Sequence, residues 1–220
     1  MSEQKIAVVT GTSSGIGLET AIHLAKNGFK TYATMRNLNK AEAIKQRGQS
    51  ENLSIEILEL DVNDDTSVKN AINTIVEKEG RIDVLVNNAG YALLGAVEDL
   101  STQEINDQFN TNVLGPYRTV REVLPTMRKQ NSGRIITISS IAGFMGMGAG
   151  SAYAASKFAV RAITDSLRVE VKSFGVKAIL VSPGPTDSKI WQKGKAYKNE
   201  MRKSVKPEIA EHYKTFAKFT

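Results

Sequence analysis

The stretch Thr10-Gly-Thr-Ser-Ser-Gly-Ile-Gly17 directly follows the apolar run Ile-Ala-Val-Val at residues 6–9. This β-branched run predicts a first strand, and residues 15–27 have the pattern of a helix that ends at Gly28. A glycine-rich turn between a strand and a helix lets the backbone approach a pyrophosphate closely, and the helix N-terminus offers free N–H groups. We therefore predict a nucleotide-binding turn; the alternative is a turn that is merely flexible.

Five further apolar runs predict strands, at residues 30–34, 53–60, 84–87, 134–139 and 177–182. Helical patterns lie between them, at residues 64–78, 101–129 and 152–174. Strands that alternate with helices predict an α/β fold, a Rossmann-like doubly wound parallel sheet with helices on both faces. Ligands of such sheets bind beyond the carboxyl ends of the strands, so the residues there are the candidates for function.

The composition limits the class of protein. A chain of 220 residues, 41% of them hydrophobic, suits one α/β domain with a full core. The absence of cysteine excludes disulfides and thiolate catalysis, and we expect no metal site. No apolar run reaches the ~18 residues that a membrane span needs. The N-terminus does not resemble a signal peptide, so we expect a cytoplasmic protein.

The net charge of +6 has a single origin. Residues 1–188 are neutral, whereas residues 189–220 hold nine basic and three acidic side chains. This basic segment is either a solvated helical face or an attractive surface for an anionic substrate or partner. Because no basic stripe occurs elsewhere, we do not expect a nucleic-acid partner.

The end of the second predicted strand bears on the choice of nucleotide. An acidic residue at this place grips a ribose 2′-hydroxyl, while an arginine accommodates a 2′-phosphate. The chain offers Arg36 and no acid. A forked guanidinium matches phosphate well, so Arg36 favours a 2′-phosphate; an ordinary surface arginine is the alternative.

A tyrosine and a lysine four residues apart, Tyr153 and Lys157, share one face of a predicted helix. A phenol has an ordinary pKa of about 10, and a nearby ammonium lowers it toward the range useful for acid–base catalysis. Ser140 lies at the end of the preceding strand and could hydrogen-bond a substrate oxygen. Such a pair is usually structural when it occurs alone, and it gains weight here from the glycine-rich turn and the serine.

Taken together, these features make the chain resemble the short-chain dehydrogenase/reductase superfamily along essentially its whole length. The matching motifs are Thr10-Gly-x-x-x-Gly-x-Gly17, Asp61-Val62, Asn87-Asn-Ala-Gly90, Asn112, Ser140, Tyr153-x-x-x-Lys157 and Pro183-Gly184. The stretches Leu93-Leu-Gly, Ala142-Gly-Phe-Met-Gly and Ala155-Ser-Lys-Phe-Ala are most similar to the branch that holds 17β-hydroxysteroid and retinol dehydrogenases.

The resemblance implies a catalytic role for each of four residues. Tyr153 would be the general acid in carbonyl reduction or the base in alcohol oxidation. Lys157 would bind the ribose hydroxyls and lower the Tyr153 pKa. Ser140 would orient and polarise the carbonyl, and Asn112 would hold a water that links Lys157 to solvent.

The resemblance also implies the cofactor, NADP with NAD as the alternative, and the residues that contact it. Asp61 would bind the adenine. Pro183, Gly184 and Thr186 would pack on the nicotinamide. Besides Tyr153 and Lys157, the expected contacts are Gly11, Ser13, Ser14, Gly15, Ile16, Gly17, Arg36, Asp61, Val62, Asn88, Ala89, Gly90, Pro183, Gly184, Thr186 and Ser188.

The domain organisation follows from the same comparison. Residues 1–188 would form the dinucleotide-binding and catalytic domain, and residues 189–220 a basic helical substrate lid of that domain. Because the chain ends 36 residues after Gly184, we expect six strands, with the family's usual seventh strand absent and the lid truncated. The resemblance implies a homo-oligomer, either a dimer or a tetramer.

Three functions compete at this point. The first is an NADP(H)-dependent oxidoreductase that transfers a hydride between the nicotinamide and an apolar carbonyl or alcohol. The second is a 3-oxoacyl thioester reductase, whose acidic carrier protein would suit the basic segment. The third is a nucleotide-binding regulator without catalysis, which the intact set of Asn112, Ser140, Tyr153 and Lys157 argues against.

Overall fold

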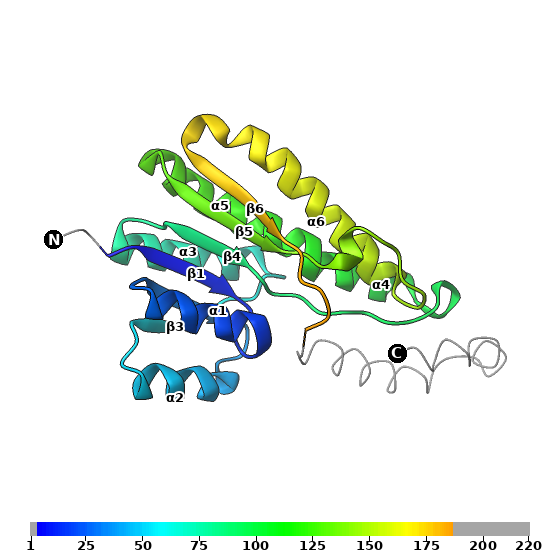
Figure 1. The fold of residues 1–220 in the computed structure, drawn as a ribbon, viewed down its shortest axis with the longest axis horizontal. Coiled ribbons are helices and arrows are strands. Elements are labelled where there is room, and N and C mark those ends of the chain that lie inside the picture. Colours follow the sequence, from blue (N-terminus) through cyan, green and yellow to red (C-terminus); the bar gives the residue numbers. More distant parts are fainter. Residues whose placement is uncertain (1–3, 187–220) are drawn as a thin grey trace.

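The computed structural model describes residues 4–186 as one sheet with helices on both of its faces (Figure 1). The strands are β1 (Ile6–Thr10), β2 (Lys30–Met35), β3 (Ile55–Glu59), β4 (Val84–Asn87), β5 (Gly133–Ile138) and β6 (Val176–Val181). All of them pair in parallel, in the order β3-β2-β1-β4-β5-β6. This arrangement confirms the predicted Rossmann-like, doubly wound sheet. The expected lid at residues 189–220 lies outside the described residues.

Alternation along the buried strands divides the core in two. On β1, Ile6 and Val8 face a cluster that includes the apolar side of α3 (Asp65–Glu79) and α5 (Gly115–Gln130). Ala7 and Val9 face the opposite cluster, with α1 (Gly15–Lys26) and α2 (Glu42–Ser50). Successive side chains of a strand point to opposite faces, so a run that is apolar throughout fits a sheet that is covered on both sides.

Two helical regions differ from the sequence prediction. Helix α2 was not expected, because its stretch is strongly polar and buries Ile44 as its one fully enclosed side chain. The single helix expected at 101–129 is α4 (Thr102–Phe109), a π-helical turn (Asn110–Leu114) and then α5. The predicted capping box is confirmed, since Ser101 and Glu104 cap α4 reciprocally.

The last helix of the described region is α6 (Ser151–Glu170), which packs beside β6 (Figure 1). It ends four residues before the predicted limit. The chain continues into a short 3-10 turn (Lys172–Phe174), which Gly175 closes with a left-handed φ of 69°. The carboxyl ends of the strands, α4 and the start of α6 therefore gather at one side of the sheet (Figure 1).

Candidate active site

The glycine-rich turn after β1 brings two backbones into direct contact. Gly11 has a φ of +70°, and a Cβ atom there would lie 2.7 Å from the Cα of Ala89, which follows β4. Gly15 also has a positive φ, of 62°. Side chains other than hydrogen are strained in this conformation, which favours glycine at both positions, and at Gly11 the contact with Ala89 excludes a side chain as well. The turn is thus packed directly against the residues that follow β4.

Gly17 has a different reason to be glycine. A Cβ atom at this position would collide with the Asn88 side chain and would lie 2.5 Å from the Gly11 carbonyl oxygen. The Asn88 amide donates to the carbonyl oxygens of Thr10 (2.9 Å) and Gly11 (3.1 Å), so it ties the turn to the end of β4. The requirement at Gly17 therefore comes from the packing of α1 on this turn, in addition to any contact with phosphate.

The start of α1 fits a pyrophosphate. Ser14 is the N-cap residue, its side chain makes no capping hydrogen bond, and the first turn holds no acidic residue. The first N–H groups of a helix have no partner within the helix, and its positive dipole end favours an anion. Ser13, Ser14 and Ile16 are half-buried around this helix end. The expected phosphate contacts are therefore together in space.

A second set of expected cofactor residues lies beside the turn. Arg36 is exposed directly after β2, and Thr12 holds the same strand end to the turn by donating two hydrogen bonds of 3.1 Å to the Thr34 carbonyl oxygen. After β3, Asp61 accepts a 3.0 Å hydrogen bond from the Asn63 N–H, and Val62 is buried. These contacts place the residues expected to meet the adenosine at neighbouring strand ends.

The end of β4 is joined to the end of β1 by one hydroxyl. The N–H groups of Asn88 and Ala89 both donate to the Thr10 hydroxyl oxygen at 3.0 Å, and that hydroxyl donates to the Val86 carbonyl oxygen at 3.3 Å. Gly90, next along the chain, is exposed. The Asn88-Ala89-Gly90 motif thus lies against the glycine-rich turn, as expected for residues that line a ribose.

The predicted catalytic residues meet in a second cluster. Ser140 follows β5, is buried, and accepts a 3.1 Å hydrogen bond from the Ala142 N–H. Tyr153, near the start of α6, is only 3% exposed and shares a hydrogen bond with the Ser140 hydroxyl. One helical turn later, the Lys157 ammonium lies 5.7 Å from the centre of the Tyr153 ring. The structure therefore brings the predicted hydroxyl, phenol and ammonium together.

Burial controls the electrostatics of this cluster. Lys157 donates to the Ile138 carbonyl oxygen at 2.9 Å, and burial lowers its pKa to about 8. The sequence predicts that Lys157 lowers the pKa of Tyr153, but in this structure the pKa of Tyr153 is raised. The cause is burial of the phenol, which outweighs the opposing hydrogen bond from Ser140.

Asn112 lies inside the π-helical turn, and both the oxygen and the nitrogen of its side-chain amide form hydrogen bonds within the protein. Its Oδ1 accepts from the Tyr91 N–H (3.1 Å), and its Nδ2 donates to the Tyr91 carbonyl oxygen (3.0 Å) and to the Ser156 hydroxyl (3.1 Å). Ser156 in turn donates to the Tyr153 carbonyl oxygen at 2.7 Å. Asn112 is therefore connected to the helix that carries Tyr153, while its expected contact with a water stays a prediction.

The sequence reasoning missed Gln108, a fully buried amide on α4 that hydrogen-bonds the segment after β4. The available signal was its position four residues before Asn112, which places the two amides on one side of the helix. Ser156 was also missed, although it lies inside the quoted motif between Tyr153 and Lys157.

The chain after β6 closes the site. The Ile141 N–H donates to the Pro183 carbonyl oxygen at 3.1 Å, so the residues expected at the nicotinamide lie beside the Ser140 turn. Gly184 and Thr186 are exposed next to it in the sequence. Ser188 lies outside the described residues, and its expected contact with a phosphate stays a prediction.

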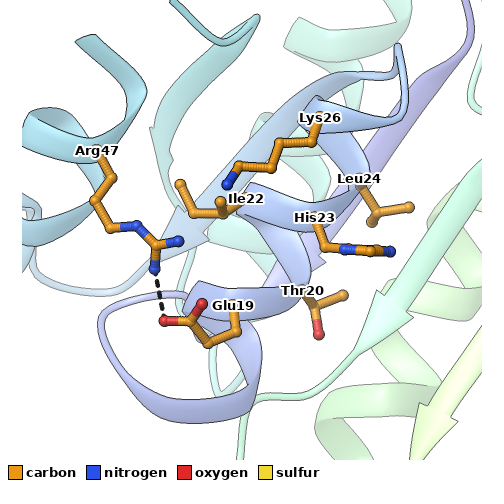
Figure 2. Close-up of a pocket in the computed structure, with 7 residues that line it drawn as sticks. All are labelled: Glu19, Thr20, Ile22, His23, Leu24, Lys26 and Arg47. Carbon is orange, nitrogen blue, oxygen red and sulfur yellow. Dashed lines mark hydrogen bonds and ion pairs between the residues drawn. The ribbon is translucent and has the colours of Figure 1, made fainter. Parts of the chain in front are cut away.

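A hollow of about 430 Å³ lies elsewhere, on the outer side of α1 (Figure 2). Its lining includes Lys26 and His23 of α1 and the ion pair of Glu19 with Arg47. None of its lining residues belongs to the predicted site. Within residues 4–186, no group of three or more potential metal ligands occurs, and no helix is long and apolar enough to cross a membrane.

Comparison with known proteins decides the family. A model described as short chain dehydrogenase matches residues 5–199. The chain belongs to this family. In this oxidoreductase the glycine-rich turn follows β1 of a parallel sheet, and the Tyr153-x-x-x-Lys157 pair lies on α6.

Three proteins with curated names are similar in sequence to this short chain dehydrogenase. It is 41% identical over 190 residues to the uncharacterized oxidoreductase YusZ of Bacillus subtilis, covering 86% of this chain and 67% of that protein. It is 40% identical over 185 residues to retinol dehydrogenase 8 of Homo sapiens, and the match covers 82% of this chain and 58% of that protein. It is 38% identical over 194 residues to 17-beta-hydroxysteroid dehydrogenase type 1 of Homo sapiens, covering 86% and 58%. The nearer resemblance is therefore confirmed, although the chain spans less than two thirds of the last two.

Solved structures agree with this assignment. ElxO with NADP bound is 36% identical, with a TM-score of 0.81 over 89% of this chain and 79% of its own. A variant of actinorhodin polyketide ketoreductase with NADPH is 28% identical, with a TM-score of 0.83 over 97% of this chain and 77% of its own. Both neighbours carry a phosphorylated nicotinamide nucleotide.

Proposed function

We propose that this short chain dehydrogenase is an NADP(H)-dependent oxidoreductase that transfers a hydride between the nicotinamide and the carbonyl or alcohol group of an apolar small molecule. The observation that carries the proposal is the buried cluster in which Ser140 hydrogen-bonds Tyr153 and Lys157 lies one helical turn away. Retinol dehydrogenase 8 and 17-beta-hydroxysteroid dehydrogenase, whose names denote apolar alcohols, support the substrate class.

The residues present fit the cofactor. Gly11 and Gly17 have no room for a Cβ atom, which keeps the turn tight, and the start of α1 directs its first N–H groups toward the place of a phosphate. Arg36, exposed at the end of β2, would hold the 2′-phosphate, since no acid takes that place. The cofactor, when bound, would supply or accept the hydride at the carbonyl carbon.

The protein's own part is the handling of one proton. The Tyr153 hydroxyl would donate its proton to the carbonyl oxygen during reduction, and the Ser140 hydroxyl would orient that oxygen by a hydrogen bond. A phenol is protonated at neutral pH, which is the form that reduction needs, and burial raises the Tyr153 pKa further in that direction. The oxidation of an alcohol needs the phenolate and should therefore become faster as the pH rises.

The test is NADPH consumption with a panel of aldehydes, ketones and acyl thioesters. We expect turnover of apolar ketones or aldehydes, with NADPH preferred to NADH. Tight binding of NADPH without turnover of any panel member would support the non-catalytic regulator instead. Gel filtration of the same preparation would test the expected dimer or tetramer.

A specific observation favours 3-oxoacyl thioesters as a second candidate substrate class. The chain matches a polyketide ketoreductase along 97% of its length, and its excess positive charge lies in residues 189–220. If this basic segment attracts an acidic carrier, kcat/KM for a carrier-bound substrate should fall steeply with salt, while that for a small ketone stays flat. A flat response for both substrates would remove this candidate.

A further inference from the structure

The segment Tyr91–Ala96, which follows β4, lies between α4 and the start of α6. Two buried amides hold its beginning from the α4 side. Asn112 binds both backbone groups of Tyr91, as described above. Gln108 binds the carbonyl oxygen of Tyr91 and the N–H of Leu93. The backbone groups of this segment therefore hydrogen-bond to side chains, whereas in a sheet they would hydrogen-bond to the backbone of a neighbouring strand.

Gln108 makes two hydrogen bonds that surround a single residue. Its Oε1 accepts from the Leu93 N–H at 2.7 Å, and its Nε2 donates to the Tyr91 carbonyl oxygen at 2.9 Å. These two groups belong to the peptide bonds on either side of Ala92. Gln108 is 0% exposed, so water cannot replace either contact. Gln108 therefore holds the peptide groups on both sides of Ala92, and it shares the Tyr91 carbonyl oxygen with Asn112.

Ala92 in turn packs against the candidate general acid. A separate buried cluster consists of Ala92, Ala142, Ala154 and the ring of Tyr153, with Met147 packed against it. Ala142 follows Ser140, and Ala154 is the neighbour of Tyr153 on α6. Ala92 is thus the one member of the four that comes from outside these two catalytic segments. It is the wall of this cluster whose backbone Gln108 holds.

A second connection leads from the same segment to the start of α6. Gly95 pairs with Gly150 in a parallel bridge, and its N–H donates to the Ala149 carbonyl oxygen at 2.9 Å. Ala149 has a left-handed φ of 54°, a conformation that a non-glycine residue holds only when its surroundings enforce it. Gly150 is the N-cap of α6, three residues before Tyr153. The bridge therefore fixes the entry of the catalytic helix.

We propose that Gln108 is a positioning residue for Tyr153: it holds the backbone on both sides of Ala92, and through Ala92 and the Gly95–Gly150 bridge it sets the place of the phenol beside Ser140. This inference rests on the proposed function, in which Tyr153 is the proton donor. Gln108 is completely buried and therefore out of reach of substrate and cofactor, so its loss should affect the chemical step and spare nucleotide binding.

Two variants separate positioning from simple stability. Gln108→Glu keeps the shape and the acceptor for the Leu93 N–H, but replaces the donor to Tyr91 by an oxygen. Gln108→Met keeps similar bulk and loses both contacts. Gln103→Met is the matched control, because Gln103 is an exposed glutamine of the same helix that only donates to Asp107. All three are compared with the unmutated chain.

Two readouts are decisive. The first is kcat for a ketone together with the dissociation constant of NADPH. We expect kcat to fall about tenfold to a hundredfold in the Gln108 variants, which is the size of effect that a small misplacement of a catalytic group produces. The NADPH affinity should stay unchanged, and the Gln103 control should keep both values.

The second readout is independent of turnover. The ultraviolet signal of tyrosinate, taken as the difference between each protein and its Tyr153→Phe form, reports the Tyr153 pKa. Burial raises that pKa in the intact protein, so a displaced wall should let water reach the phenol and lower it toward the ordinary value. Lys157 is present in every variant, and with its pKa lowered to about 8 it is already neutral at the pH where the phenol titrates.

The outcomes are distinct. Lower kcat and a lowered Tyr153 pKa at unchanged NADPH affinity support the inference. Variants that melt earlier but keep the normal kcat per folded molecule and the normal tyrosine titration overturn it. If the unmutated protein turns over no carbonyl substrate, the proposed function fails, while the titration still decides whether Gln108 positions Tyr153.

Discussion

The two halves of the sheet build their parts of the site by opposite means. On the side of β1 to β3, the glycine-rich turn is made by backbones that touch, and Gly11 and Gly17 leave no room for a Cβ atom. On the side of β4 to β6, buried side chains make the hydrogen bonds: Gln108 binds the backbone of Leu93, Asn112 donates to the Ser156 hydroxyl, and Ser156 donates to the Tyr153 carbonyl oxygen.

The difference teaches what each half tolerates. A backbone contact fails when volume is added, since neither backbone can move aside cheaply. A buried hydrogen bond fails when a partner is removed, since the remaining group has lost water without compensation. Added atoms should therefore damage the nucleotide side, and deleted atoms the catalytic side. Four experiments examine this contrast, beginning with the largest expected effect.

Tyr153→Phe deletes a single oxygen atom in the catalytic half. General acid–base catalysis contributes about 10²–10⁴-fold, so kcat should fall by that factor, while NADPH affinity stays nearly intact. Steady-state kinetics with a titration of NADPH fluorescence measure both. Normal turnover by the variant would refute the catalytic role of the tyrosine and would move the regulator hypothesis ahead.

Lys157→Met deletes a buried charge in the same half and should reveal its electrostatic penalty. The folded pKa of Lys157 is lowered to about 8 from an ordinary value near 10.5, so the unfolded chain binds the extra proton between these values. Stability of the cofactor-free protein should therefore rise with pH across this window. The whole contribution is about 3 kcal/mol at 1.36 kcal/mol per pKa unit.

Urea unfolding at several pH values measures this contribution. The stability difference between Lys157→Met and the unmutated chain should change from pH 8 to pH 10.5, the limits set by the two pKa values, and be flat below that window. Lys172→Met, at an exposed position, serves as the control and should not alter the pH profile. An identical profile for all three proteins would show that Lys157 is not buried as a charge.

Arg36→Asp changes an exposed side chain in the nucleotide half of the sheet, on which the predicted preference for NADPH over NADH depends. One charge-assisted contact with phosphate contributes roughly 1.5–3 kcal/mol, which corresponds to about a ten- to hundredfold preference for NADPH. The substitution should reverse the order of NADPH and NADH in calorimetric titrations. Arg134→Asp makes the same change of charge at the opposite end of the sheet and should leave the order unchanged. Equal affinities in the unmutated protein would contradict the prediction.

Gly17→Ala adds a single carbon to the nucleotide half. Overpacking of this kind typically costs about 1–3 kcal/mol, because Asn88 and the Gly11 backbone must move. Gly48→Ala adds the same carbon in the interior of α2, where the nearest atom is 3.9 Å away, and should stabilise the protein by roughly 0.5–1 kcal/mol. In thermal melts, Gly17→Ala should lower the melting temperature and Gly48→Ala should raise it. A change in the same direction for both variants would contradict the proposed contrast.

Much of the fold could be predicted because each signal is local. Strand runs and the helices between them follow from periodicity, and the capping box at Ser101 follows from spacing. Helix α2 could not be predicted, since a polar stretch that buries Ile44 shows little periodicity. The π-helical turn depends on contacts that Asn112 makes with a distant part of the chain, which periodicity does not record.

The candidate site, like the fold, could be predicted from the sequence only in part. Motif spacing identified Ser140, Tyr153 and Lys157, and the structure brings them together. The sign of the Tyr153 pKa shift was wrong, because burial is a property of the folded environment and not of the i, i+4 spacing. Gln108 was missed for a related reason. Its two hydrogen bonds reach backbone atoms of Tyr91 and Leu93, which carry no signal in the sequence.

The π-helical turn Asn110–Leu114 has a consequence for how this chain can vary in length. Helix α4, the π-helical turn and α5 follow one another without a break. An α-helix rotates by about 100° per residue, and the wider π-helical turn changes the direction in which the side chains of α5 point relative to those of α4. Before this turn, Gln108 faces the segment after β4; beyond it, Thr119 donates to Asn87 at 2.6 Å and Arg118 contacts Asp65. Deleting any one residue of the turn would rotate one set of contacts away from the other, even if every named side chain were kept. Among related sequences, the number of residues between Gln108 and Thr119 should therefore be as constant as the residues themselves.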